Sequence, residues 1–218
     1  MHVRLIILIA ALFLILQSAV AQTVTVAVAA NMKDAFSEIA QEFKANHKSE
    51  LRVVYGSSGN FAAQIQNGAP FQLFIAADER FPLELYKNGK TLNEGSVYAI
   101  GKLVLIAKAN DGLPLTANKT EIATAIQKAR RIAIAKPDLA PYGKAAVEYL
   151  KAEGLWDLAK DKIVYGDNIG VATTYVVTGA ADIGFTALSL AKATEVAKDT
   201  RYVLVNAHCM HPLNSAWS

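Results

Sequence analysis

The feature that most constrains the fold of this chain is a unit that recurs along it. An apolar, β-branched run is followed by a short polar turn and then by residues with helical spacing, with strands that begin near Thr23, Leu51, Ile132 and Ile163. Apolar strands that alternate with helices are typical of sheets buried between helices in α/β proteins. Because the units come in two sets, the sequence predicts an α/β protein with two lobes around a cleft.

A long β-type run marks the expected boundary between the lobes. The run 97–107 is longer than an average strand, and Gly101 in its middle predicts a bend or a crossing between domains. We therefore expect residues 22–99 to form the first lobe and residues 100–199 the second. Residues 200–218 are expected to return to the first lobe.

The first 21 residues have the pattern of a secretory signal peptide. His2 and Arg4 give a short basic start, residues 5–16 form an apolar run of 12 residues, and Ala19 and Ala21 supply the small residues of a cleavage site. A membrane span needs about 20 apolar residues, so a cleaved signal is favoured over an uncleaved anchor. The residue directly after the expected cleavage site is not a cysteine, so we expect no lipid anchor.

Charge and cysteine usage narrow the function classes. The chain has 22 Lys and Arg against 19 Asp and Glu, a formal net charge of +3. This balance argues against nucleic-acid binding, which is usually associated with a strongly basic face. Cys209 is the only cysteine, so a secreted form of the chain has no internal disulfide. The four histidines form no obvious metal-binding set.

One of the polar turns has the chemistry of an anion site. Gly56-Ser57-Ser58-Gly59 lies between a strand and a helix whose apolar positions include Phe61 and Ile65. The first N–H groups of a helix have no intrahelical partner, and the helix dipole favours negative charge there. Two hydroxyls beside these amides therefore predict a place for an anion.

Three further turns occupy equivalent places in the predicted sheets. Asn31 stands where the N-cap of the first helix is expected, Tyr142 follows Pro141 at a helix start, and Asn168 follows the strand near 163. Each turn alone could be only a cap. Together they lie at the carboxyl ends of strands, where open α/β sheets bind ligands. With Ser58 they offer neutral donors to a small oxyanion, and no lysine or arginine belongs to the set.

Other chemistries fit the residues less well. Ser58 could be the nucleophile of a secreted serine hydrolase, but Asn60 breaks the G-x-S-x-G pattern and no histidine lies in a plausible partner loop. We therefore expect no enzyme. Neither nucleotide-binding glycine motif is present. A sulfate- or phosphate-binding protein remains an alternative, with Asp167 as the only nearby acceptor for a phosphate proton.

The chain resembles the periplasmic molybdate-binding proteins of molybdate ABC transporters. The resemblance covers almost all of the chain after residue 21, in family order. It is carried by the segments Val28-Ala29-Ala30-Asn31, Gly56-Ser57-Ser58-Gly59, Asn67-Gly68-Ala69-Pro70, Phe74-Ile75-Ala76-Ala77-Asp78, the run 98–105, Pro141-Tyr142-Gly143 and Gly179-Ala180-Ala181-Asp182-Ile183-Gly184-Phe185.

This resemblance implies a fold, a ligand and a partner. The fold is the two-lobed, type II periplasmic binding protein, or venus flytrap, with a central mixed sheet in each lobe. The ligand is molybdate or tungstate, bound as an oxyanion without a cofactor or a direct protein ligand to the metal. The implied protein is a periplasmic monomer that closes around the anion and delivers it to an ABC permease in the membrane.

The resemblance also implies which residues bind the anion. One branch of the family has a serine in the first loop, an alanine at the position of Tyr142 and a late tyrosine where this chain has Ala187. This chain resembles the other branch, with Asn31, Ser58 and Tyr142 as side-chain donors. The backbone donor after the fourth strand falls on Asn168 or Ile169.

The end of the chain departs from the family. Family members run further, through a strand that returns to the first lobe and a final helix, whereas this sequence stops at residues 214–218, about where that strand begins. The segment 208–211 also looks unlike the family. We therefore expect the first lobe to lack a strand and a helix, which would expose a sheet edge.

Overall fold

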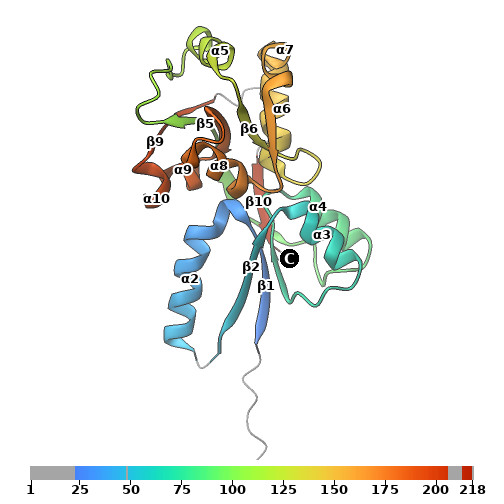
Figure 1. The fold of residues 1–218 in the computed structure, drawn as a ribbon. Coiled ribbons are helices and arrows are strands. Elements are labelled where there is room, and N and C mark those ends of the chain that lie inside the picture. Colours follow the sequence, from blue (N-terminus) through green and yellow to red (C-terminus); the bar gives the residue numbers. More distant parts are fainter. Residues whose placement is uncertain (1–22, 48, 206–212, 218) are drawn as a thin grey trace, which may run out of the picture.

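A computed structural model describes residues 23–47, 49–205 and the strand at 213–217. The expected signal peptide at 1–21, Cys209 and the segment 208–211 lie outside the described residues. Within the described ranges, none of the helices has the length and apolar character needed to cross a bilayer. The chain forms two lobes, one above the other in Figure 1.

The first lobe is built on a five-stranded mixed sheet. Its strand order is β2-β1-β3-β10-β4, in which β1 is parallel to β2 and β3, and β10 is antiparallel to β3 and β4. The strands are β1 (Val24–Ala29), β2 (Leu51–Gly56), β3 (Leu73–Ile75), β4 (Ser96–Gly101) and β10 (Leu213–Trp217), and the helical segments are η1 (Ala30–Met32), α2 (Lys33–Asn46), α3 (Ser58–Gln66) and α4 (Arg80–Lys87).

Alternation along β1 explains how helices cover both faces of this sheet. Successive side chains of a strand point to opposite faces. Val26 and Val28 pack with Phe36 of α2 on one face, and Ala27 packs with Phe61 of α3 on the other. The first lobe therefore has two small hydrophobic clusters, one on each side of its sheet.

The second lobe has a five-stranded mixed sheet with the order β7-β6-β8-β5-β9. In it β6 is parallel to β7 and β8, whereas β5 is antiparallel to β8 and β9. The strands are β5 (Leu103–Lys108), β6 (Ile132–Ala135), β7 (Ile163–Gly166), β8 (Ile183–Ala187) and β9 (Thr200–Leu204), and the helical segments are α5 (Lys119–Lys128), α6 (Pro141–Ala152), α7 (Trp156–Ala159), η2 (Lys160–Lys162), α8 (Ile169–Thr178), α9 (Leu188–Lys192) and α10 (Thr194–Ala197).

The chain changes sheets at Lys102, between β4 and β5. The run 97–107 is therefore divided between the two sheets, as Gly101 in its middle indicated. The change comes slightly later than the expected start of the second lobe at residue 100, because β4 stays paired with β10 up to Gly101.

The expectation that residues 200–218 return to the first lobe is wrong for β9. This strand pairs with β5 in the second sheet, with Thr200 opposite Lys108 and Leu204 opposite Val104. The buried side chain of Val203 joins the core of the second lobe, so β9 extends that core. Of the two strands described after residue 199, β10 alone belongs to the first sheet.

The expectation that the first lobe lacks its returning strand is also wrong. β10 fills the position between β3 and β4, with Leu213 opposite Gly101 and Trp217 opposite both Ser96 and Ile75. Strands pair through their backbone N–H and C=O groups, so a segment whose side chains differ from those of the family can still complete the sheet. The first sheet is therefore continuous from β2 to β4.

Candidate functional site

The turns that were expected to bind an anion lie where the two lobes meet. In the first sheet, Ala29 pairs with Gly56, and Val28 pairs with Ile75, so the turns after β1, β2 and β3 are neighbours. In the second sheet, Ala135 pairs with Gly166, which brings the turns before α6 and α8 together. Figure 1 shows the upper end of β1 directly below α8 and α9.

Asn31 lies in the 3-10 segment η1 and is buried. Its side chain does not cap α2, because the N-cap position is Met32 and carries no side-chain hydrogen bond. The Oδ1 atom of Asn31 has no hydrogen-bond partner among the described residues. A buried amide oxygen without a partner is unusual in a folded protein. The oxygen only accepts hydrogen bonds and cannot bind an oxyanion itself, but a half-turn of the amide places the Nδ2 donor at the same point. The expected capping role is thus wrong, and the amide is available for binding.

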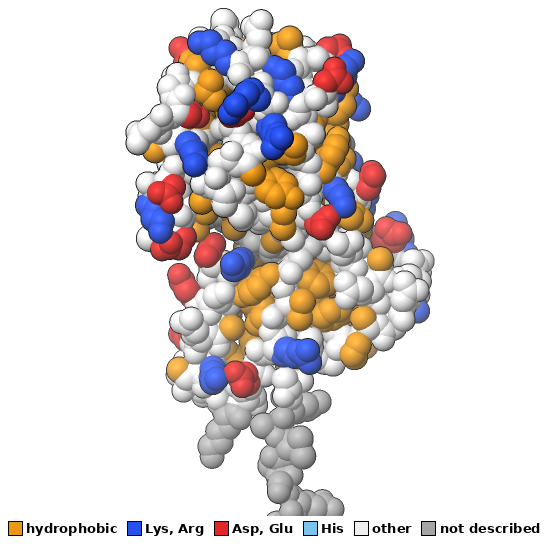
Figure 2. All heavy atoms as spheres, in the orientation of Figure 1, with side chains coloured by type: hydrophobic (Ala, Val, Ile, Leu, Met, Phe, Trp, Pro, Cys, Tyr) orange, Lys and Arg blue, Asp and Glu red, His pale blue; other side chains and the backbone are white. Residues whose placement is uncertain are grey.

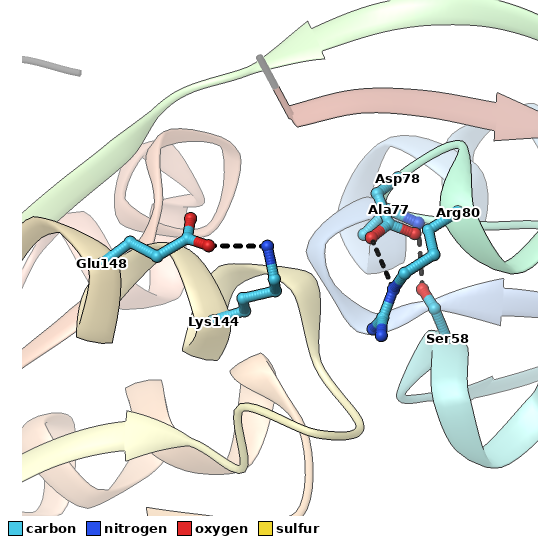
Figure 3. Close-up of polar contacts among 6 residues, drawn as sticks. All are labelled: Ser58, Ala77, Asp78, Arg80, Lys144 and Glu148. Carbon is cyan, nitrogen blue, oxygen red and sulfur yellow. Dashed lines mark hydrogen bonds and ion pairs between the residues drawn. The ribbon is translucent and has the colours of Figure 1, made fainter. Parts of the chain in front are cut away.

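Ser58 is fully buried at the first position of α3. Its Oγ accepts a hydrogen bond from the Ala77 N–H at 3.0 Å, as Figure 3 shows. A hydroxyl that accepts one bond still has its own hydrogen to donate. The turn after β3 therefore orients the Ser58 hydroxyl as a donor.

Ser57 supplies one of the two hydroxyls expected at the anion turn, although it was not named among the individual donors. It occupies the N-cap position of α3, yet its side chain makes no capping bond. Its Oγ is buried and has no partner among the described residues. The pair of adjacent serines was the available signal, and only the structure shows that both hydroxyls are buried at the turn.

Tyr142 comes from the second lobe, in the first turn of α6. Its ring is buried, and burial together with the nearby Tyr98 raises the pKa of its phenol well above the ordinary value. The hydroxyl is therefore neutral at physiological pH and can donate a hydrogen bond. Tyr98 belongs to β4 of the first lobe and donates its own hydroxyl hydrogen to the Ala76 carbonyl at 3.2 Å.

The two alternatives for the fourth turn have different roles. The Asn168 side chain caps α8, because its Oδ1 accepts the Val171 N–H at 3.1 Å. Ile169 is the first residue of that helix and is buried. The N–H groups of Ile169 and Gly170 have no intrahelical partner because they lie in the first turn. Ile169 is thus the better candidate for a backbone donor, and Asn168 holds the helix start in place.

Two direct contacts join these turns across the lobes. The Gly59 N–H on α3 donates to the Leu139 carbonyl, in the loop before Tyr142, at 2.8 Å. On the other side, the Ser189 hydroxyl on α9 donates to the Asn31 carbonyl at 2.7 Å. The first contact joins the loops of Ser58 and Tyr142, and the second joins the loop of Asn31 to α9 of the second lobe.

Charged groups near this boundary are paired with one another. Asp78 follows β3, and its Oδ2 lies 3.8 Å from Arg80 Nε. Burial raises the pKa of Asp78, although Arg80, the Phe81 N–H and Lys144 of the second lobe act in the opposite direction. Lys144 Nζ lies 2.6 Å from Glu148 Oε1 on the same helix (Figure 3). The turns that carry Asn31, Ser58 and Tyr142 thus present neutral donors. Asp78 adds a carboxylate beside them, and its Oδ1 is buried without a hydrogen-bond partner among the described residues.

The hydrolase alternative lacks a histidine base near Ser58 among the described residues. His47 is the one histidine in the described ranges, and it stacks on Phe43 at the end of α2. The phosphate alternative named Asp167 as an acceptor. Asp167 is exposed and pairs with Lys136 at 2.5 Å, so the structure gives it a surface ion pair instead.

Comparison with known proteins identifies relatives of this chain. The chain is 40% identical over 179 residues to the molybdate-binding protein ModA of Azotobacter vinelandii, which covers 79% of this chain and 67% of the relative. It is 36% identical over 177 residues to ModA of Rhodobacter capsulatus, which covers 78% of this chain and 66% of that relative. The chain thus spans about two thirds of the length of these relatives.

Solved structures show the same fold. The periplasmic molybdate-binding protein of Azotobacter vinelandii matches with a TM-score of 0.77 and 33% identity, over 89% of this chain and 84% of that one. The sulfate-binding protein SubI of Mycobacterium tuberculosis matches with a TM-score of 0.72 at 17% identity, which concerns the fold alone. The family model for bacterial extracellular solute-binding proteins matches residues 24–216. The chain therefore belongs to the bacterial extracellular solute-binding protein family.

Proposed function

We propose that this chain is the periplasmic component of an ABC transporter that binds molybdate or tungstate between its two lobes and delivers the anion to a membrane permease. Family membership and the named function of the relatives in Azotobacter and Rhodobacter support this function. The secretory signal at 1–21, the monomeric state and the absence of catalysis belong to the same proposal.

The observation that carries the proposal is the convergence of buried neutral donors from both lobes. Asn31 and Ser58 belong to the first lobe, and Tyr142 and Ile169 belong to the second. Inward-pointing N–H and O–H dipoles can balance an anion where water is excluded. Because the donors come from both lobes, all of them can reach the anion only when the lobes are closed around it.

Selectivity in this site would depend on size. Molybdate, tungstate and sulfate are all tetrahedral dianions, so charge cannot separate molybdate from sulfate. Closure to a fixed geometry, set by direct contacts such as that of Gly59 with Leu139, gives the donors a fixed spacing. We expect that spacing to suit the larger molybdate and tungstate ions.

Isothermal titration calorimetry of the secreted chain tests this function. Molybdate and tungstate should bind, and sulfate and hydrogen phosphate should not compete with them. Hydrogen phosphate is included because Asp78 is a partly buried carboxylate directly after Ala77, whose N–H donates to the Ser58 hydroxyl. Preferential binding of sulfate or phosphate would replace the proposal with the alternative oxyanion.

A matched pair of serine variants tests the site. Ser58→Ala removes a donor to a buried charge and should weaken molybdate binding by about 1.5–3 kcal/mol, or roughly 10- to 150-fold. Ser37→Ala is the control, because the Ser37 hydroxyl bonds only within the first lobe, to the Lys33 carbonyl and the Tyr55 hydroxyl. Equal affinities of both variants, with the fold intact, would remove Ser58 from the site. A fluorophosphonate probe should label neither protein.

A further inference from the structure

We propose that Gly59 and Ser189 form a two-point latch between the lobes, which holds the anion-binding loops together and slows release of the bound anion. The latch consists of the hydrogen bond from Gly59 N–H to the Leu139 carbonyl and the bond from Ser189 Oγ to the Asn31 carbonyl. The part that concerns release of the anion rests on the proposed function. The part that concerns lobe closure does not.

The Gly59 contact brings two backbones together. Gly59 is buried in the first turn of α3, directly after Ser58. A Cβ atom at Gly59 would lie 2.9 Å from both the Cα and the carbonyl oxygen of Leu139, and 3.0 Å from the ring of Phe81. Real Cβ atoms do not approach backbone atoms this closely. Only a glycine therefore lets α3 of the first lobe meet the loop that carries Tyr142.

The Ser189 contact connects the anion loop to the crossover. The Leu188 N–H donates to the carbonyl of Lys102, the residue at which the chain changes sheets, at 2.9 Å. The next residue, Ser189, donates to Asn31 at 2.7 Å. Leu190 behind them is buried in the core of the second lobe. One short turn, fixed in the second lobe, thus contacts both the crossover and a site loop.

The Ser189 bond is not a local feature of its own helix. The hydroxyl reaches a residue 158 positions away in the sequence and in the other lobe, and the N-cap position of α9 is Ala187, with no side-chain capping bond. Ser189 itself is exposed, so its removal leaves no core cavity. Its main effect should therefore fall on the contact between the lobes.

The two contacts predict a specific kinetic effect. Both are made between groups of the protein, so they add to whatever the anion contributes to closure. An anion enters when the lobes are apart, so the association rate constant should stay the same or rise when the latch is weakened. The closed population should fall, and the bound anion should leave faster.

The test uses two latch variants and two controls. Gly59→Ala places a methyl group between the lobes, and Asn60→Ala is its control, because Asn60 is the exposed next residue of α3. Ser189→Ala removes the second contact, with Ser37→Ala as its control and Ser189→Thr as a rescue that keeps the hydroxyl. Small-angle scattering of each variant without added anion gives the radius of gyration, and stopped-flow fluorescence with molybdate gives the two rate constants.

We expect a larger radius of gyration for Gly59→Ala and Ser189→Ala than for wild type and both controls. The dissociation rate constant should rise about 2- to 10-fold for Ser189→Ala, as expected for one hydrogen bond, and more for Gly59→Ala, with an association rate constant equal to or above that of wild type. Ser189→Thr should restore wild-type values. Wild-type radii and rates in both latch variants would overturn the latch.

Failure of the proposed function would look different. If the wild-type chain bound no molybdate, the radii would still decide whether Gly59 and Ser189 hold the lobes together. If molybdate bound and neither the radii nor the rate constants changed in the latch variants, the latch would be wrong and the function would stand.

Discussion

Strands β4 and β5 follow each other in the chain and are both rich in apolar residues, yet β5 is buried and β4 is largely exposed to solvent. Both have six residues and are separated only by Lys102. Residues 103–107 of β5 are at most 1% exposed, whereas Val97 and Ile100 of β4 are 46% and 67% exposed. β5 lies inside the second sheet, between β8 and β9, and β4 is an edge strand of the first sheet.

This difference shows that the place of a strand in its sheet, more than its composition, decides its burial. The strands and helices of the second lobe form one large core, which also includes Ala29, Ala30 and Ala77 of the first lobe, whereas the rest of the first lobe has two small clusters. Figure 2 shows hydrophobic side chains gathered on the surface of the first lobe, below a second lobe whose visible face is richer in charges. We therefore regard the second lobe as the more rigid frame for the site.

The largest expected effect separates the two strands directly. Leu105→Ala in β5 should lower the free energy of unfolding by about 2–5 kcal/mol, because it leaves a cavity in a fully buried position. Ile100→Ala in β4 is the matched change and should lower it by less than about 0.5 kcal/mol. Urea denaturation measures both. Equal losses would show that the exposed strand carries as much packing as the buried one.

The next effect compares the lobes at the site. Tyr142→Phe removes a hydroxyl of the second lobe while keeping a buried ring, and Asn31→Ala removes an amide of the first lobe. If both lobes bind the anion, each change should weaken molybdate binding by about 1.5–3 kcal/mol in calorimetry. A loss confined to Asn31→Ala would mean that the second lobe only covers the anion.

The smallest expected effect is a pair of pH dependences with opposite signs. Burial raises the pKa of Asp78 in the first lobe above its ordinary value of 3.8. Burial alone would also raise the pKa of Asp182 in the second lobe, but the N–H groups of Arg131 and Arg130 and the Arg130 guanidinium together lower it.

The signs follow from proton linkage. Folded Asp78 binds its proton more tightly than the unfolded chain, so its contribution to the free energy of unfolding falls as the pH rises from 3.8 through its folded pKa. Asp182 contributes stability above pH 3.8 that is lost as the pH falls through its lowered folded pKa.

Urea titrations between about pH 3 and pH 6 check these signs. Relative to wild type, Asp78→Asn should become more stable as the pH rises, and Asp182→Asn should become less stable. Ile100→Ala should follow the wild-type pH dependence, because it removes no titratable group. Two carboxylate variants with the same sign would contradict the assigned environments.

Much of this architecture could be predicted from local pattern. The apolar runs of β1 and β6, the crossover near Gly101 and the serine turn after β2 all have signals within a few residues. The sheet to which β9 belongs could not be predicted in this way, because its partner β5 lies almost 100 residues away in the sequence. Antiparallel pairing over that distance is decided by the whole core.

The same limit applies to the site. The loops of Asn31, Ser58 and Tyr142 could be placed together because each follows or precedes a recognisable strand or helix. The roles of Ser57 and Asn168 could not, since a residue at a helix start either caps the helix or faces a ligand, and both uses have the same sequence pattern. Only the hydrogen-bond partners distinguish them, with Asn168 bonded to Val171 N–H and Ser57 left without a partner among the described residues.

Thermal unfolding of the secreted chain with and without molybdate, and with sulfate as the control, tests the central claim most directly. A ligand that binds only the folded state adds about 2.7 kcal/mol of stability at a hundredfold excess over its dissociation constant. The account predicts a clear upward shift of the unfolding temperature with molybdate and none with sulfate. A cooperative transition that molybdate does not move, or that sulfate moves equally, would contradict a molybdate site between the lobes.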